Sequence, residues 1–483
     1  MITRFSHAAA SGLLTALLAG CSVAPTYERP AVEMPGAFKE ARLSAAEQQR
    51  WKAAQPADDL ARGRWWAIFK DPALDALQEH AMQANQDLQA AAARVKQARA
   101  LQKNARADRF PELTAGLGAN RQRTSEAAGD PASAGGTATL WRAQAGLSYE
   151  VDLFGRVASE VDAAGADTQR AQALYHSVLL ALQADVAQSY FLIRQLDGEA
   201  LLYEHTIALR RLSLDLVETR FREGDISELD VARARSELAA ARAEALGVER
   251  QRAAAEHGLA VLLGRPPADF SLSHQPLARI AVSIPAGLPS SLLERRPDIA
   301  AAERALAAAN ARVGAARAAL FPQLALTGSF GFESSELDEL LRWSSRSFLL
   351  GPLIGTALSM PIFDGGRRQA GVDRARARYE EDVALYRQSV LKAFGEVEDG
   401  LSSLRLLGEQ TEVQDTAVAA AARAAELSKT QYEAGSVSYL DVIDADREVL
   451  RHRRAVVQLD GLRAHAAVQL IRAIGGGWED SRG

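Results

Sequence analysis

The sequence predicts a mainly α-helical chain that is internally duplicated and also carries four short β-strands. The first observation behind this prediction is the distribution of proline. The 483 residues include 16 prolines, yet none lies between Pro131 and Pro266 and none follows Pro361. Both proline-free stretches are rich in Ala, Arg, Glu, Leu and Gln, which favour helices. The other two observations are motifs that recur at a constant spacing and segments in which apolar and polar residues alternate.

The duplication is visible as residue groups that recur 211 positions further along the chain. Short matches arise by chance, but one constant spacing at six separate places does not. Each half is therefore expected to contain the same order of elements. The matching groups are Asp87-Leu88 and Asp298-Ile299, Phe110-Pro111 and Phe321-Pro322, Leu147-Ser148 and Leu358-Ser359, Gly155-Arg156 and Gly366-Arg367, Gly224 and Gly435, and Ser227-x-Leu229-Asp230-Val231 and Ser438-x-Leu440-Asp441-Val442.

Long helices account for most of each half. Apolar residues spaced three and four apart in these stretches predict coiled-coil-like packing against neighbouring helices. A break at Gly198, or at Gly395 and Gly400, is the alternative to continuous long helices. The helices are predicted at 73–108, 157–222, 228–263, 368–433 and 439–473.

Two strands precede the long helix of each half. They begin near Leu113 and Trp141 in the first half, and near Leu324 and Ile354 in the second. Strands of about ten residues with one apolar and one polar or small face are typical of transmembrane barrels. A sheet with one solvent-exposed face has the same pattern, so the alternation alone leaves both interpretations open. In the clearest strand the apolar face consists of Trp141, Ala143, Ala145, Leu147, Tyr149 and Val151.

The N-terminus predicts where the protein is located. A basic start is followed by an apolar run, Ala8 to Gly20, which is shorter than the roughly 20 residues that span a bilayer. The run ends in Leu18-Ala19-Gly20-Cys21, which resembles the lipobox of bacterial lipoproteins and implies cleavage before an acylated Cys21. Ser22 then implies sorting to the outer membrane, which favours the barrel interpretation of the strands. The alternative is a plain secretory signal with a chance or buried cysteine.

Composition excludes several classes of protein. With 48% hydrophobic residues, 24% charged residues and one cysteine, the chain is neither disordered, nor a disulfide scaffold, nor a multi-span helical membrane protein. A net charge of −5 gives no reason to expect nucleic acid. The eight histidines are scattered and no Walker-type phosphate loop is present. We therefore expect no enzyme activity, no catalytic residue, no metal site, and no cofactor except a covalent lipid on Cys21.

Four strands are too few to close a barrel. In hydrocarbon an open edge leaves unpaired N–H and C=O groups, each of which costs several kcal/mol. Other copies of the chain must therefore complete the barrel. The unpaired edges demand a closed ring of copies but do not fix their number.

The ordered motifs of the chain resemble those of the TolC-like outer-membrane efflux family, in its NodT-type lipoprotein branch. The resemblance implies a homotrimer in the outer membrane of a Gram-negative bacterium, with a twelve-stranded barrel and an α-helical tunnel in the periplasm. The motifs are Cys21-Ser22-Val23-Ala24-Pro25-Thr26-Tyr27, Arg295-Arg296-Pro297-Asp298-Ile299, Phe321-Pro322, Leu358-Ser359-Met360-Pro361-Ile362-Phe363-Asp364-Gly365-Gly366 and Gly435-x-x-x-Tyr439-Leu440-Asp441-Val442.

The resemblance also implies a function and partners. The trimer would passively conduct drugs or other organic solutes that a periplasmic adaptor (a membrane fusion protein) and an inner-membrane RND-type transporter deliver to it. Metal-ion efflux and type I secretion use the same kind of outer component and remain alternatives, as does a lipid-anchored coiled-coil spacer that conducts nothing. The segments expected on this basis are a signal peptide (1–20), a lipid-anchored and equatorial segment (21–72), a first repeat (73–263), an equatorial linker (264–290), a second repeat (291–473) and a C-terminal tail (474–483).

The resemblance places a periplasmic gate on Leu440, Asp444 and Arg447. Their spacing of three and four puts them on one helix face. Leu440 would form an apolar constriction, and Asp444 an acidic ring that Arg447 holds from the same or a neighbouring chain. The alternative is a solvated surface pair of charges.

The turns between the long and returning helices are the expected docking sites for the adaptor, with plain solvent-facing turns as the alternative. Glycine at the start of each turn suits a left-handed C′ position. Asp230 and Asp441, three residues after Ser227 and Ser438, suit a variant of the capping box. The docking turns are Gly224-Asp225-Ile226-Ser227 and Gly435-Ser436-Val437-Ser438.

Overall fold

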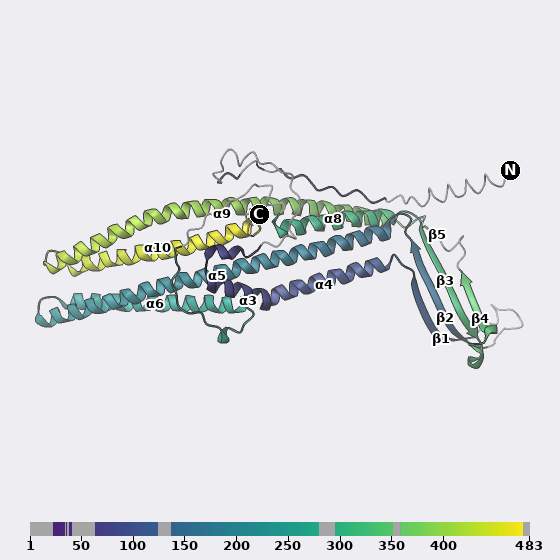
Figure 1. Cartoon of the computed structure of the whole chain (residues 1–483), viewed down its shortest axis with the longest axis horizontal. Coiled ribbons are helices and arrows are strands. Elements are labelled where there is room, and N and C mark those ends of the chain that lie inside the picture. The colour runs from purple at the N-terminus through teal and green to yellow at the C-terminus, as the bar shows by residue number, and fades with distance from the viewer. Residues whose placement is uncertain are drawn as a thin grey trace. The chain divides into compact units, whose positions relative to one another are not determined.

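The computed structural model consists of long helices and one antiparallel sheet (Figure 1). Contacts divide the chain into two compact units, which we describe separately. Unit 1 combines residues up to 31 with 94–172 and 301–386, and unit 2 contains the rest. The predicted signal peptide and Cys21 lie outside the described residues. The structure describes residues 23–33, 35, 38–40, 63–123, 137–279, 295–350, 358–360 and 362–476.

The helices agree closely with the sequence prediction. The two longest, α5 and α9, run through Gly198, Gly395 and Gly400 without a break. A Cβ added at Gly400 would lie 3.1 Å from the Leu470 side chain, so glycine there permits close helix packing. The helices are α3 Pro72–Ala84, α4 Gln86–Ala107, α5 Arg156–Glu223, α6 Glu228–Leu262, α8 Pro297–Ala318, α9 Arg367–Glu433 and α10 Tyr439–Ala473, with the short 3₁₀ helices η1 Trp65–Phe69, η2 Pro267–Asp269, η3 Leu337–Glu339 and η4 Trp343–Ser345.

One predicted helix is divided in two. The region expected as a single helix over 73–108 contains α3 and α4, with Asn85 between them in an extended conformation at ψ 127°. The Asn85 side chain accepts a hydrogen bond from the Leu88 N–H and so caps the second helix. Composition did not reveal this break because asparagine is only mildly unfavourable inside a helix.

The duplication is repeated in the element boundaries. Helices α8 and α10 and strand β3 begin and end 211 positions after α4, α6 and β1. Helix α9 begins 211 positions after α5. The register agrees as well, because Glu112 pairs with Ser148 and Gln323 pairs with Ser359.

The sheet belongs to unit 1 and is antiparallel throughout. Its order is β1-β2-β3-β4, and β5 also pairs with β3, so the two edges are β1 and the β4–β5 side. The fourth predicted strand begins earlier than expected, at Arg346, and is described as two pieces, because residues 351–357 lie outside the described residues. The strands are β1 Glu112–Arg123, β2 Thr137–Val151, β3 Gln323–Ser334, β4 Arg346–Leu350 and β5 Leu358–Ser359.

The two faces of the sheet differ as predicted. On one face Arg142 lies opposite Gly118 and Glu333, and its guanidinium contacts the Glu333 carboxylate at 3.3 Å. On the other face four of the six apolar-face residues of β2 lie opposite apolar residues of β3, including Phe330 and Phe332. All twelve residues of β1 are exposed, which leaves this edge strand without cover in the single chain.

Unit 2 contains the largest apolar clusters. One cluster joins η1, α3, α5 and α10 around Trp66 and Tyr190, and a second joins α3, α4, α5 and α6 around Ile193 and Leu259. A third cluster lies where the long and returning helices meet. Among the described residues, none of the helices has a stretch long and apolar enough to cross a membrane.

Candidate functional site: helix tips and repeat junction

The turns at the ends of α5 and α9 have the same backbone geometry. Gly224 and Gly435 have φ values of 86° and 73°, which glycine adopts without a steric penalty. Asp225 donates its backbone N–H to the Arg220 carbonyl at 3.0 Å, and Ser436 donates to the Gln431 carbonyl at 2.9 Å. These bonds close Schellman motifs and satisfy carbonyls at the helix ends.

The returning helices are capped to different extents. At α10 the Asp441 carboxylate accepts the Ser438 backbone N–H at 2.8 Å and the Ser438 hydroxyl at 2.6 Å. These hydrogen bonds hold the pKa of Asp441 below its usual value. At α6 the Asp230 carboxylate accepts the Ser227 hydroxyl at 3.3 Å and contacts Arg233 at 3.5 Å.

The two tips pack against each other through an apolar cluster. The cluster takes residues from α5, α6, α9 and α10, so it joins both halves of the repeat. The Ser213 and Tyr439 hydroxyls lie 3.1 Å apart at its edge. Its buried members are Val217, Val231, Ala234, Tyr439, Val442 and Ile443.

The predicted gate residues lie on the first turns of α10. The side chains of Asp444 and Arg447 are more than half exposed, and Leu440 is 37% exposed. Arg447 Nη1 lies 3.1 Å from Asp444 Oδ1, so the predicted pair forms within one chain. Arg447 also donates from Nε to Glu237 of α6 at 3.1 Å.

Glu237 is the functional candidate that the sequence analysis missed. Its side chain is only 12% exposed, and its carboxylate contacts Arg210 of α5 at 3.0 Å as well as Arg447. The hydrogen bond to Glu237 is the main reason why the pKa of Arg447 is raised. Residues 237 and 447 are far apart in sequence and not related by the repeat, so neither spacing nor periodicity identified the contact.

The charged pair predicted for the gate is specific to the second half. At the equivalent positions of the first half, 211 residues earlier, Asp444 is replaced by Arg233 and Arg447 by Ser236, whereas Leu440 is matched by Leu229. The two tips therefore share an exposed leucine and differ in charge.

A small cavity lies between α5, α6 and α10 just behind the tips. It has a volume of about 100 Å³, and its lining includes Arg210, Glu237, Tyr439 and Asp446. Burial raises the pKa of Asp446, and the charges of Arg210 and Lys429 oppose this shift.

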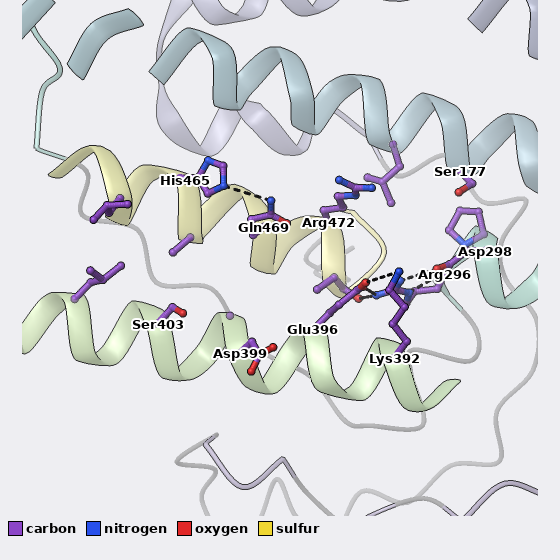
Figure 2. Close-up of a pocket in the computed structure, with 17 residues that line it drawn as sticks. Ser177, Arg296, Asp298, Lys392, Glu396, Asp399, Ser403, His465, Gln469 and Arg472 are labelled. Atoms are coloured by element: carbon purple, nitrogen blue, oxygen red, sulfur yellow. Dashed lines mark hydrogen bonds and ion pairs between the residues drawn. The ribbon is translucent and has the colours of Figure 1, made fainter. Parts of the chain in front are cut away.

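A larger cavity of about 510 Å³ lies where α8, α9 and α10 meet (Figure 2). Arg296 reaches from its edge to three partners. It pairs through two nitrogens with Asp298, at 2.6 and 3.0 Å, and donates to Glu396 at 2.6 Å and to the Ala473 carbonyl at 2.9 Å. Burial alone would raise the pKa of Asp298, but the hydrogen bond and charge of Arg296 outweigh it and lower that pKa.

These contacts explain part of the Arg295-Arg296-Pro297-Asp298-Ile299 motif. Arg296 joins the start of α8 to the end of α10, where a cation is favoured by the helix dipole. Burial lowers the pKa of His465, which lines the same cavity near Gln469. Within the part of the chain that the structure describes, no group of three His, Cys, Asp or Glu side chains is arranged to hold a metal ion.

Comparison with known proteins places this geometry in a family. The sequence pattern of the family "Outer membrane efflux protein" matches residues 77–265 and again residues 288–476. The chain is 37% identical over 472 residues to the solvent efflux pump outer membrane protein SrpC of Pseudomonas putida, with 96% of this chain and 97% of SrpC covered. It is 33% identical over 467 residues to the cation efflux system protein CusC of Escherichia coli O6:H1, with 96% and 97% covered.

Solved structures share the fold. A crystal structure of the open state of the Neisseria gonorrhoeae MtrE outer membrane channel has a TM-score of 0.80 at 30% identity, with 95% of this chain and 98% of MtrE covered. The two matches to one family pattern, at the spacing of the repeat, and the full-length similarity to curated members lead to one conclusion: the chain belongs to the outer membrane efflux protein family.

Proposed function

We propose that this chain is the outer-membrane channel of a three-component efflux pump and passively conducts small organic molecules to the exterior. The observation that carries the proposal is full-length similarity to efflux channel proteins combined with a sheet whose two edge strands pair with no further strand among the residues that the structure describes. A periplasmic adaptor and an inner-membrane RND-type transporter would load the channel. The similarity to a solvent pump component supports organic substrates, and the similarity to CusC makes cation export the second candidate.

The open edges support closure of the sheet by other copies of the chain. Within the chain, Val151 of β2 pairs with Leu324 of β3. Ile362 lies one repeat after Val151, and Leu113 lies one repeat before Leu324. If the strand at each open edge repeats this pairing, Ile362 of one copy pairs with Leu113 of the next. These two side chains are 98% and 77% exposed in the single chain. We propose that three copies close a twelve-stranded barrel in this register.

Disulfide cross-linking tests the register. The double variant Leu113→Cys with Ile362→Cys should form linked dimers and trimers on oxidation, because directly opposed residues lie roughly 4.5–5.5 Å apart at Cα. A matched control replaces Leu113→Cys by Thr114→Cys, whose side chain lies on the other face of the strand. Equal linkage in both pairs, or linkage in neither, would contradict the proposed pairing.

Conductance in planar bilayers tests the proposed channel and its gate. We propose that Leu440, Asp444 and Arg447 narrow the tunnel at the tips and that Glu237 holds Arg447 in place. Arg447→Ala, Asp444→Ala and Glu237→Gln should each raise the conductance of the isolated trimer. The control is Glu426→Gln, which removes an exposed ion pair with Arg423 on α9. If neither the unmodified protein nor any variant conducts, the protein is a non-conducting spacer. Unchanged conductance in the three gate variants would contradict the assignment of the gate to these residues.

Adaptor docking at the turns is tested by cross-linking from single cysteines. Ser436→Cys should link to the adaptor in whole cells, because this turn exposes backbone and small side chains at the tip. Thr416→Cys is the control, an exposed position about 30 Å from the tip along α9. Equal linkage from both positions would count against a docking role. Sensitivity of a deletion strain to organic solvents and to metal salts would decide between the two substrate classes.

A further inference from the structure

The apolar face of the sheet carries charge at one end only. The strand register defines this face, which contains the odd-numbered residues of β1 and β2 and the even-numbered residues of β3, β4 and β5. Among the described residues of these strands, its charged side chains are Arg121, Arg123 and Arg346, and it contains no aspartate or glutamate. All three arginines are exposed. We call them the arginine rim.

The arginine rim lies at the end of the sheet that is remote from the helices. Strand β1 follows α4, so Arg121 and Arg123 are its last residues on the apolar face, and β4 begins at Arg346. At the other end of the strands, where the helices join, the same face ends in Leu113 and Val151. Because the helices extend into the periplasm, the arginine rim is on the exterior side of the membrane.

The opposite face of the sheet has charges of both signs. Arg142, at the same end of the sheet, lies there with its guanidinium 3.3 Å from the Glu333 carboxylate. Glu150 of that face pairs with Arg156 at the start of α5, at 2.6 Å. Charges on the polar face are thus balanced within the chain. A face whose charges are all positive instead attracts anions from its surroundings.

The arginine rim is confined to edge strands. Strands β1 and β4 lie at the two ends of the strand order. On β3, the interior strand that is equivalent to β1 in the repeat, Arg121 and Arg123 are replaced by Phe332 and Ser334. In the barrel proposed above, β1 of one copy pairs with the β4–β5 side of the next. Each seam between copies therefore receives Arg121 and Arg123 from one copy and Arg346 from its neighbour.

An exposed tryptophan accompanies Arg346. The guanidinium carbon of Arg346 lies 4.4 Å from the centre of the Trp343 ring, and Arg346 Nη1 donates to the Trp343 carbonyl at 3.3 Å. The Trp343 side chain is 72% exposed. Tryptophan is enriched where hydrocarbon meets lipid headgroups, and arginine on a lipid-facing strand is costly at the bilayer midplane but tolerated near the surface. These side chains therefore mark the level of the headgroups on the exterior side.

We infer that the arginine rim binds the phosphate groups of lipid headgroups in the outer leaflet, at each seam between copies. A guanidinium can donate two parallel N–H groups to one phosphate, which makes arginine well suited to this ligand. Exposed apolar side chains of the same face, Leu117 and Phe348, continue the surface towards the acyl chains. A lipid bound in this way contacts two copies of the chain at once and so holds their seam together. The inference rests on the outer-membrane channel and the three-copy barrel proposed above.

Native mass spectrometry of the full-length trimer in detergent tests this binding. The probes are phosphorylated lipid A and the same lipid after removal of its phosphates. The unmodified trimer should bind one phosphorylated lipid per seam and prefer it over the dephosphorylated form. The triple variant Arg121→Gln, Arg123→Gln and Arg346→Gln should bind it at least about tenfold more weakly, because each cation near the membrane surface adds to the attraction of anionic lipid.

The matched control is Arg142→Gln, which removes an arginine at the same end of the sheet but on its other face. It should bind phosphorylated lipid A as the unmodified protein does. Equal binding of the two lipids by the unmodified protein, unchanged affinity in the triple variant, or an equal loss in Arg142→Gln would each overturn the inference.

A second variant keeps the inference testable if the triple variant does not assemble. Arg346→Gln removes one cation from each seam and should weaken binding about fivefold, and unchanged affinity would contradict the role of the rim. Conductance in bilayers of phosphatidylcholine separates these outcomes from a failure of the channel proposal. A variant that conducts normally but has lost its preference for phosphorylated lipid A supports the inference. An unmodified protein that conducts nothing yet prefers that lipid would refute the channel and leave the lipid site standing.

Discussion

Asn85 and Arg296 occupy the same position in the two halves of the repeat. In the first half the Asn85 side-chain amide donates to the Leu262 carbonyl at 2.9 Å, at the end of α6. In the second half Arg296 donates to the Ala473 carbonyl at 2.9 Å, at the end of α10. The two carbonyls are themselves equivalent, because positions 262 and 473 are one repeat apart. A neutral side chain and a charged one thus bind the same group.

Arg296 contacts one more helix than Asn85 does. Asn85 also caps the start of α4 with its carbonyl oxygen, whereas Arg296 leaves that task to Asp298, which accepts the Ile299 N–H at 3.0 Å. Arg296 gains a contact with Glu396 on α9, which Asn85 is too short to match on α5. The difference teaches that an ion pair can join three helices where an amide joins two, at the cost of burying a charge.

Removal of Arg296 should therefore have the largest effect on stability. Arg296→Met leaves the Ala473 carbonyl buried without a donor and separates two carboxylates from their cation, at a cost of about 3 kcal/mol. Asn85→Ala should cost about 1 kcal/mol, as loss of a cap and one neutral hydrogen bond. Denaturant unfolding of the purified protein measures both. A control, Arg423→Met, removes an exposed pair and should cost well under about 1 kcal/mol. Equal losses for Arg296→Met and Asn85→Ala would refute the comparison.

The glycines that follow the ends of α6 and α10 extend the comparison between the two halves. Gly264 and Gly475 both have positive φ, at 66° and 87°. A Cβ at Gly264 would lie 2.4 Å from the Ala84 carbonyl oxygen, but at Gly475 the nearest atoms, of Arg295, are 3.0 Å away. Gly264→Ala should cost about 2 kcal/mol and Gly475→Ala about 1 kcal/mol, from strain in the left-handed region and the closer clash. Denaturant unfolding tests the order of the two losses in stability. A larger loss for Gly475→Ala would show that the backbone around Gly264 adjusts more easily than that around Gly475.

Sequence patterns were sufficient for the repeated framework. The spacing of 211, the long helices and the alternation around Trp141 predicted the element boundaries to within a few residues, because they depend on local preference and on periodicity. The helix break at Asn85 and the early start of β4 at Arg346 were not predicted, since single polar residues and short strands give weak local signals.

Contacts between distant segments could not be predicted in the same way. The motif around Arg296 drew attention to that residue, but nothing in its spacing pointed to Glu396 or to the Ala473 carbonyl. Likewise, Arg447 was singled out beside Asp444, three residues away, whereas its more buried partner Glu237 lies on another helix. Such pairs depend on how helices pack, which short-range patterns do not encode. The acylation of Cys21 stays a prediction.

Acid should weaken the contacts around Arg296 and Asp298 in the second half of the repeat and not those of Asn85 in the first half. The pKa of Asp298 is lowered in the folded chain, from an unfolded value near 3.9. A lowered pKa means that the carboxylate stabilises the fold above about pH 4 and that this contribution is lost as pH falls through the folded value. Asn85 has no titrating group. Unfolding measured between about pH 3 and 7 should show a smaller pH dependence in Asp298→Asn, and an unchanged pH dependence would show that other carboxylates dominate.

The smallest expected effect is at the tips, where the two halves differ in capping. The Asp441 carboxylate accepts the backbone N–H of Ser438, whereas the Asp230 carboxylate accepts hydrogen bonds from two side chains, the Ser227 hydroxyl and Arg233. Asp441→Ala should therefore speed hydrogen exchange in the first turn of α10 more than Asp230→Ala does in the first turn of α6. Leu440 lies in this turn of α10, and Asp444 and Arg447 follow it, so loosening the turn should also raise conductance if these residues form the gate. Faster exchange without any change in conductance would separate the stability of the cap from the control of the channel.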